Sequence, residues 1–308
     1  MNQPYPIPVL FCFFNRPIIA KRTFEEIRKC KPPKLYLASD GPRQSHNESS
    51  IVSNLRDDII ASIDWECEVK TLFRNENLGC SLGIKTAVDW LFENENCGII
   101  LEDDCVVQSS FWEYMQATLL RYENDSRIGM IAGYNHLNSI FNEDSYAFSS
   151  YKACWGWATW RRAWENMDLE MKWRTTHQYN DIMMRTGLYG KDIRETEFKL
   201  MKIDENLVSA WDWQWYSSLA SQNQLCIFPA VNLVTNIGFG EGATHTKNKS
   251  ESTDASQNLT FPLKHPNYIV PNYLFDKKFH YNLYNWKRII RNFLIPMFLY
   301  KHIFKKGK

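Results

Sequence analysis

Zinc-binding and disulfide patterns are missing from this chain of 308 residues. It has eight cysteines, but no two of them form a CxxC pair or stand at another metal-ligand spacing. Cys12 and Cys226 lie inside apolar runs, so the cysteines are expected to be reduced core thiols of a cytosolic protein. The sequence therefore predicts neither a zinc site nor a disulfide framework.

Glycine-rich phosphate loops are also missing, because neither GxGxxG nor GxxxxGK occurs. Such loops bring backbone N–H groups close to phosphates, and without one the dinucleotide and P-loop interpretations fail. A phosphate-bearing ligand would then need a divalent cation. Carboxylate oxygens as ligands favour Mg²⁺ or Mn²⁺ over zinc.

The chain also lacks a strong net charge and a long apolar run. The net charge of +1 argues against nucleic-acid binding, while the hydrophobic content of 44% supports a sizeable core. The longest apolar run, Phe293–Tyr300, contains Pro296 and is too short to span a bilayer. The first residues show no secretory signal, so a cytoplasmic protein is expected.

Strands and helices alternate through the first 135 residues. Apolar runs predict strands, and apolar residues at helical spacing predict helices. The expected strands are Val9–Phe14, Leu35–Ala38, Val69–Phe73, Ile99–Leu101 and Ile128–Ala132, and the expected helices are Ile18–Cys30, Ile51–Ile63, Ser81–Phe92 and Ser110–Tyr122. The last helix is expected to begin with a capping box of Ser110 and Glu113. This order predicts an α/β fold with a mostly parallel, doubly wound sheet.

The alternation fades after residue 135. Helices are expected at Asp181–Lys202 and around 204–221, followed by a strand at Leu225–Phe228 and a Gly-rich loop at Gly238–Gly242. An aromatic-rich piece, Tyr146–Trp173, has no clear periodicity.

An acidic triplet follows the expected strand at Ile99–Leu101. Glu102, Asp103 and Asp104 are consecutive, and such carboxylates repel one another unless a cation or hydrogen-bond donors hold them. A solvated acidic turn is the alternative. The position favours a site, because open α/β sheets bind ligands beyond the carboxyl ends of their strands.

Further polar residues follow the other expected strands and should converge on the same crevice. They are Asn15 and Arg16 after the first strand, Asp40 after the second, Arg74 after the third, and Asn77 and Gly79 in the loop before the next helix. Phe13, near the end of the first strand, is also expected to contact the donor.

Four short segments together resemble the nucleotide-sugar half of a GT-A glycosyltransferase: residues 8–17, Ser-Asp-Gly at 39–41, Asn-Glu-Asn-Leu-Gly at 75–79 and Leu-Glu-Asp-Asp at 101–104. A second match lies downstream, where Trp211-Asp212 and then Cys226-Ile227-x-Pro229 stand at the spacing of the family named next and a Gly-rich loop follows. Within that fold the chain is similar to the inverting N-acetylglucosaminyltransferase family that begins complex N-glycan synthesis, whose Glu-Asp-Asp form of the DXD motif it shares. The resemblance covers roughly residues 8–245.

The resemblance implies a Rossmann-like GT-A fold and a role for each matching residue. Asp104 would bind Mn²⁺ or Mg²⁺ at the donor diphosphate, and Glu102 and Asp103 would lie near the ribose and nucleotide. Asp40 would contact the uracil, Arg16 the nucleotide or phosphate, and Asp212 would be the catalytic base. Residues 1–135 would form the nucleotide-sugar-binding half, 136–262 the acceptor-binding and catalytic-base half, and 263–308 a C-terminal helical tail.

Other donor and acceptor contacts are expected around these residues. His245 follows the Gly-rich loop, where it could contact the diphosphate or the metal, although a lone histidine is more often structural. Trp155, Trp157 and Trp211 are candidates for a wall that stacks on a sugar, with core packing as the alternative. Asp212 lies between two tryptophans, where partial desolvation would improve it as a base.

The segment 277–308 carries nine basic residues and no acid, interleaved with aromatic and aliphatic residues. This composition suits either a helix on an anionic membrane or an ordinary terminal helix docked on the domain. The chain lacks the anchor and disulfides of the lumenal relatives, so a bacterial surface-polysaccharide enzyme fits better. Its acceptor would be a glycan or a lipid-linked saccharide at the inner face of the cytoplasmic membrane.

The sequence and the resemblance together predict an inverting, metal-dependent glycosyltransferase that uses a UDP-sugar donor, with GlcNAc or another hexose as the sugar. The alternatives are a sugar-nucleotide-forming nucleotidyltransferase and a non-catalytic carbohydrate-binding protein on the same fold. The nucleotidyltransferases usually carry glycines in the first strand-turn, which Phe13-Phe14-Asn15-Arg16 lacks.

Overall fold

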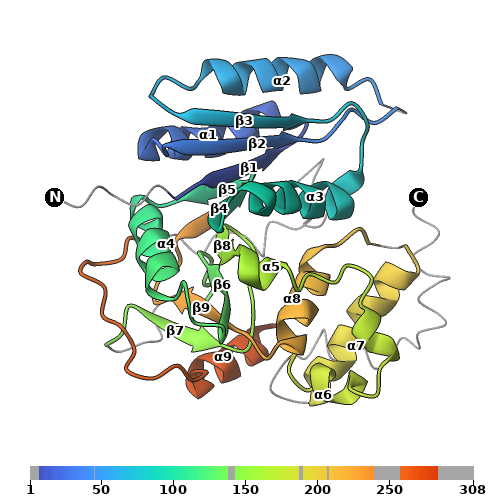
Figure 1. Ribbon diagram of the computed structural model, residues 1–308, viewed down its shortest axis with the longest axis vertical. Helices are drawn as coiled ribbons and strands as arrows, with labels where there is room; N and C mark the ends of the chain where they lie inside the picture. Colours follow the sequence, from blue (N-terminus) through green and yellow to red (C-terminus); the bar gives the residue numbers. More distant parts are fainter. Residues whose placement is uncertain are drawn as a thin grey trace.

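The computed structural model describes residues 7–44, 46–137, 143–186, 190–206, 208–238 and 257–283. Its centre is an eight-stranded sheet in the order β3-β2-β1-β4-β8-β6-β9-β7, which extends from one end of the molecule to the other (Figure 1). The strands are β1 (Val9–Phe13), β2 (Lys34–Ser39), β3 (Glu68–Phe73), β4 (Cys97–Glu102), β6 (Ile128–Ala132), β7 (Tyr146–Ser149), β8 (Trp157–Trp160) and β9 (Leu225–Pro229). A separate two-stranded sheet pairs β5 (Cys105–Val107) with β10 (Val234–Asn236).

Helices flank this sheet. They are α1 (Pro17–Cys30), α2 (Ser49–Ala61), α3 (Gly79–Asn94), α4 (Ser109–Arg121), α5 (Arg161–Trp164), α6 (Tyr179–Met183), α7 (Gly190–Asp204), α8 (Asp212–Ser221) and α9 (Tyr273–Leu283), with a 3₁₀ turn at Lys172–Thr175. Helices α6 and α7 form a small lobe beside α8 (Figure 1). None of the helices within the described ranges has the length and apolarity needed to cross a membrane.

The sheet is mostly parallel, as the alternating sequence pattern predicts. Strands β3, β2, β1 and β4 are parallel neighbours, and β6 pairs in parallel with β9. Strands β8 and β7 are antiparallel to their partners. Since β4 and β6 are both antiparallel to β8, they point the same way. The α/β fold class is therefore confirmed, with the sheet built from both the first and the second part of the chain.

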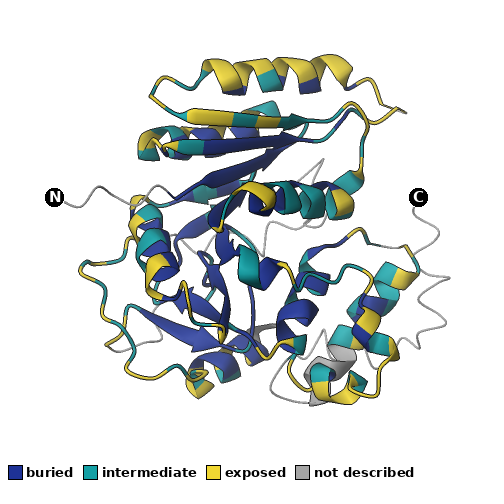
Figure 2. Cartoon of the chain, viewed as in Figure 1, coloured by how far each residue is buried: buried dark blue, intermediate teal, exposed yellow. Residues whose placement is uncertain are grey.

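Alternate residues of the strands serve two cores, one on each face of the sheet. In β1, Val9 and Phe11 face the core that holds α1, α2 and α4, whereas Leu10 and Cys12 face the core that holds α3, α5, α8 and α9. A strand covered on both faces reads as a continuous apolar run, which explains the sequence of β1. Figure 2 shows these buried strands between the helical layers.

The tryptophan-rich Trp157–Trp160, for which the sequence predicts no element, forms strand β8 between β4 and β6. Three local expectations are wrong. The single helix expected at Asp181–Lys202 is divided into α6 and α7, and the one expected from about 204 begins at Asp212. Helix α4 has no capping box: the Ser110 hydroxyl accepts the N–H of Leu259 at 2.9 Å, and the Oδ1 of the distant Asn258 accepts the N–H of Ser110 at 3.1 Å instead.

Candidate functional site

The acidic triplet lies where β4 ends, at the shared carboxyl edge of β1, β2 and β4. Glu102 is the last residue of β4 and is half-buried, while Asp103 is only 4% exposed. The backbone of the turn is fixed from α1, since the Thr23 hydroxyl donates to the carbonyl oxygen of Asp103 at 2.7 Å. The triplet is therefore built into the carboxyl edge of the sheet and is not a solvated turn.

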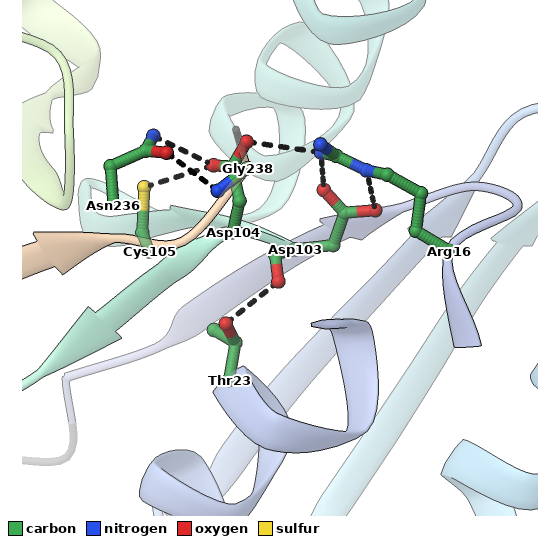
Figure 3. A network of polar contacts seen from close by, with 7 residues as sticks. All are labelled: Arg16, Thr23, Asp103, Asp104, Cys105, Asn236 and Gly238. Carbon is green, nitrogen blue, oxygen red and sulfur yellow. Dashed lines mark hydrogen bonds and ion pairs between the residues drawn. The ribbon is translucent and has the colours of Figure 1, made fainter. Parts of the chain in front are cut away.

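Arg16 joins two of the three carboxylates (Figure 3). It follows β1 and precedes Pro17 at the start of α1, so strand and helix together aim its guanidinium across the edge of the sheet. Its Nε donates to Asp103 Oδ2 at 3.2 Å and its Nη2 donates to Asp103 Oδ1. The same Nη2 donates to Asp104 Oδ2 at 3.1 Å. Arg16 after the first strand and the acids after the fourth strand therefore lie together, as the sequence predicts.

Asp104 is held from the other side by the two-stranded sheet of β5 and β10. The amide of Asn236 donates to Asp104 Oδ1 at 3.1 Å, and the N–H of Ile237 donates to the Asp104 carbonyl at 2.9 Å. Gly238 passes so close that an added Cβ would lie 2.1 Å from Asp104 Oδ2. The carboxylate thus lies between Arg16 and the first residues of the Gly-rich segment, as Figure 3 shows.

Negative charge outweighs positive charge in this site. Burial, followed by Asp104, Asp103 and Asp212, raises the pKa of Glu102 well above its ordinary value. Burial also raises the pKa of Asp103 to about 6, although the Arg16 guanidinium opposes the shift. A cation bound here would relieve the repulsion among these carboxylates.

Asp212 approaches the triplet from the distant helix α8. It is the first residue of that helix, half-buried between Trp211 and Trp213. The N-terminus of α3 holds the preceding segment, since the Ser81 hydroxyl donates to the Ala210 carbonyl at 2.6 Å. Asp212 lies near enough to Glu102 to contribute to the raised pKa of that carboxyl group. Burial does most to raise the pKa of the Cys80 thiol, and Glu102 and Asp212 both add to that shift.

Asp40 lies at the same edge, where it binds the start of α3. Its carboxylate accepts the N–H groups of Leu78 and Gly79 at 3.0 Å, and that of Gly41 at 3.1 Å. The N-terminus of a helix stabilises such a negative charge. The expected contact of Asp40 with a uracil stays a prediction.

Arg56 of α2 fixes the backbone around Asp40. Its Nη2 donates to the carbonyls of Asp40 and Arg74 at 2.9 and 2.7 Å, so one side chain joins the ends of β2 and β3. The Arg74 side chain turns to Thr86 on α3, at 2.7 Å, and Asn77 donates to the Gly41 carbonyl at 2.8 Å. Both residues therefore support the loops at this edge of the sheet through protein contacts.

Asn15 belongs to a buried polar group with Glu48. The Asn15 amide donates to Glu48 Oε1 at 2.6 Å, and the Arg43 guanidinium pairs with the same carboxylate. The Arg43 side chain also lies over the Phe14 ring, 5.6 Å from its centroid. Hydrogen bonds from Arg43 do most to lower the pKa of Glu48, to about 2.

This lowered pKa predicts an acid-dependent loss of stability. A carboxylate whose folded pKa falls from 4.5 to about 2 stabilises the fold above pH 4.5, and this contribution disappears as the pH falls through about 2. Glu48→Gln should therefore lower the free energy of unfolding at neutral pH by roughly 1–2 kcal/mol, allowing for solvent screening at the half-exposed Arg43. The deficit should shrink as the pH falls. Urea unfolding at several pH values measures it, with the exposed Glu113→Gln as control. A deficit independent of pH would contradict the assignment.

Three residues predicted to contact a ligand, Phe13, Trp157 and Trp211, are buried in the core. Phe13 stacks on Phe11, with 5.2 Å between ring centroids, and is 4% exposed. Trp157 is fully buried and stacks on the buried Trp211 at 5.4 Å. The expectation that these three side chains line a ligand is therefore wrong for this structure, because core packing occupies their rings.

Trp155 is the remaining candidate for a sugar-stacking wall. It is partly exposed and meets Tyr134 edge to face, with 4.5 Å between ring centroids. His245 and the Gly-rich loop beyond Gly238 lie outside the described residues.

The donor set at Asp104 fits a cation shared with a ligand better than one caged by protein. Within the described ranges, no three His, Cys, Asp or Glu side chains gather as metal ligands. Mg²⁺ is usually bound through one or two carboxylates together with substrate phosphates and water. The Asp104 side chain is 17% exposed against 6% for Asp103, so its oxygens are the more accessible of this pair.

Sequence reasoning missed several residues that shape the site. Asn236, Thr23, Glu48 and Arg56 contact the triplet or its neighbouring loops from positions far away in the chain. Only Asn236 had a local signal, since it stands between an apolar strand and a glycine-rich stretch.

Comparisons with known proteins assign no family. No protein-family model and no curated protein match the chain. Among solved structures, the mannosyltransferase PcManGT from Pyrobaculum calidifontis, in complex with GDP-Man and Mn²⁺, is 10% identical, with a TM-score of 0.33 over 51% of this chain and 45% of its own. The chain thus spans less than half of that protein.

Two UDP-glucose pyrophosphorylase structures are also similar. The complex with UDP-glucose is 12% identical, with a TM-score of 0.30 over 52% of this chain and 70% of its own. The apo form is 8% identical, with a TM-score of 0.38 over 74% of this chain and 93% of its own. These values are too low to carry an argument about this chain, and the resemblance to the N-acetylglucosaminyltransferase family stays a prediction.

Proposed function

We propose that this protein is an inverting, metal-dependent glycosyltransferase that moves a sugar from a UDP-sugar to a hydroxyl of a glycan or lipid-linked acceptor. The observation that carries the proposal is the approach of Asp212 to the triplet. A carboxylate on α8 lies within electrostatic reach of Glu102, at the edge where parallel sheets bind ligands. This arrangement would provide a donor-binding side and a separate catalytic base.

The donor side would be formed by the triplet and its partners. Asp104 presents carboxylate oxygens beside the guanidinium of Arg16 and the backbone of Gly238. A divalent cation bound by Asp104 would stabilise the negative charge that develops on the β-phosphate as the nucleoside diphosphate departs. Glu102 and Asp103 would hold the nucleotide, and Asp40 the nucleobase.

The acceptor side would use Asp212 as general base. An acceptor hydroxyl is a poor nucleophile, so Asp212 would take its proton while the oxygen attacks the anomeric carbon and the bond to the phosphate oxygen breaks. Attack from the side opposite the leaving group inverts the anomeric centre. Trp155 is the partly exposed aromatic residue that could stack on a sugar.

Nucleotide binding is the first test of this proposal. UDP-sugars with Mn²⁺ should raise the thermal midpoint of the protein, since a ligand that binds only the native state stabilises it. Slow release of UDP from the UDP-sugar should accompany binding, and the product anomer, assigned by NMR, should be inverted.

The alternatives give different results in the same assays. A nucleotidyltransferase would form a UDP-sugar from UTP and a sugar 1-phosphate and release pyrophosphate. A non-catalytic binding protein would show a thermal shift with a saccharide and no turnover. Either outcome would replace the proposed function.

A further inference from the structure

Exposed apolar side chains gather on one short segment near α9. Five of the large hydrophobic residues that are exposed in the described ranges belong to residues 268–281: Tyr268, Val270, Tyr273, Leu274 and Tyr281. Tyr268 is 77% exposed, Leu274 64% and Tyr281 61%. We call these five residues, with Lys277 and Lys278, the α9 surface. Clusters of this kind on a soluble fold mark interaction sites more often than chance exposure does.

The opposite face of α9 is fixed to the fold. Phe275 and Phe279 pack on Phe228 of β9, with ring centroids 4.9 and 5.5 Å away. Asp276 is fully buried and accepts the hydroxyl of Ser149 and the N–H of Ser150 at the end of β7. Figure 2 shows both buried and exposed residues along this helix. Tyr273, Leu274 and Tyr281 are therefore presented by a docked helix, while Tyr268 and Val270 lie in the segment just before it.

The charge of the α9 surface is positive. Lys278 is exposed, Lys277 is partly exposed, and the Nζ of Lys277 lies 5.8 Å from the centroid of the Tyr273 ring. The one acid between residues 257 and 283 is the buried Asp276. The sequence from 284 to 308 continues this composition with seven basic residues and no acid among many apolar ones.

We infer that the α9 surface docks the protein on an anionic lipid membrane. Tyrosine rings and leucine suit the boundary between headgroups and acyl chains, and the neighbouring lysines suit anionic headgroups. A second copy of the chain fits less well, because it would bring two positive surfaces together. This inference does not rest on the proposed enzymatic function, although it would place the site near a lipid-linked acceptor.

Vesicle co-sedimentation tests the inference without any sugar nucleotide. The full chain is mixed with vesicles of phosphatidylcholine alone, or of equal parts phosphatidylcholine and phosphatidylglycerol. We expect binding to the anionic vesicles that weakens with added salt. Lys277→Glu/Lys278→Glu should weaken it on the order of 30-fold or more, taking each lysine at about fivefold. Tyr273→Ser/Leu274→Ser should weaken it on the order of tenfold.

Matched variants elsewhere on the surface serve as controls. Ile60→Ser/Leu120→Ser removes two exposed apolar side chains from α2 and α4, and Lys172→Glu reverses an exposed lysine. These variants should bind like the wild type, and all variants should keep the wild-type thermal midpoint.

Three results would overturn the inference: no binding to anionic vesicles, equal binding to neutral vesicles, or unchanged binding by both α9 variants. Dimerisation that Tyr273→Ser/Leu274→Ser abolishes, without vesicle binding, would assign the surface to a second copy. Unchanged vesicle binding by a protein that releases no UDP would leave the inference intact and count only against the proposed function.

Discussion

Asp212→Asn is expected to lower kcat by about 10²–10⁴-fold, the usual contribution of a positioned general base. The amide has nearly the same shape as the carboxylate but cannot take the proton of the acceptor hydroxyl. Donor binding should persist, because the residues proposed to hold the nucleotide come from the edge of β1, β2 and β4. Steady-state UDP release gives kcat, and a thermal shift with the UDP-sugar reports donor binding.

Asp181→Asn is a matched control for this substitution. Both aspartates lie in the first turn of a helix, α8 for Asp212 and α6 for Asp181. Each loses a favourable interaction with the helix dipole, worth about 0.3–1 kcal/mol, so the two variants should be destabilised alike. Only Asp212→Asn should lose turnover. A normal kcat for Asp212→Asn would show that another residue is the base.

Asp104→Ala is expected to abolish the response of the protein to Mn²⁺ and to lower kcat/KM by about 10²-fold or more. The substitution removes the accessible carboxylate that would hold the cation, while Arg16 keeps its two contacts with Asp103. Thermal midpoints measured with UDP-sugar, with and without Mn²⁺, show the loss of metal-dependent binding separately from turnover.

Glu93→Ala is the control for Asp104→Ala, since Glu93 is an exposed acid near the end of α3. It should keep both the metal response and the activity. If Asp104→Ala retains the Mn²⁺-dependent shift, the cation is bound by other residues and the assignment of Asp104 is wrong. The midpoint without ligands separates this result from simple unfolding.

The sequence predicted elements where the apolar pattern is local and strong. Pro17 fixes the backbone at the first helical position, and the helix it opens was expected almost at its observed bounds. The apolar run Ile99–Leu101 predicts a buried strand followed by acids, and it forms the end of β4, Cys97–Glu102. These features depend on neighbours within a few residues, which a sequence pattern records.

Tryptophan-rich segments do not reveal from the sequence whether they line a sugar site or pack in the core. The side chains of Trp157 and Trp211 are large, apolar and capable of hydrogen bonding, so their composition suits a sugar site and a core equally well. Their partners decide between the two. Trp157 lies in a strand inserted between β4 and β6, where both faces of the sheet are covered. A strand inserted out of chain order leaves no periodic signal in the sequence.

The α/β fold class, the strand that carries the acidic triplet, and the polar residues at the ends of the first strands can be predicted from the sequence. What surrounds Asp104, and the approach of Asp212 to Glu102, depend on the tertiary structure. Asn236 pairs with Cys105 in the two-stranded sheet of β5 and β10, and the Ser81 hydroxyl donates to the carbonyl of Ala210 just before α8. These contacts join residues 131 and 129 positions apart, respectively, and strand register and helix packing fix them. The helix and strand propensities of neighbouring residues do not predict contacts between residues so far apart in the chain.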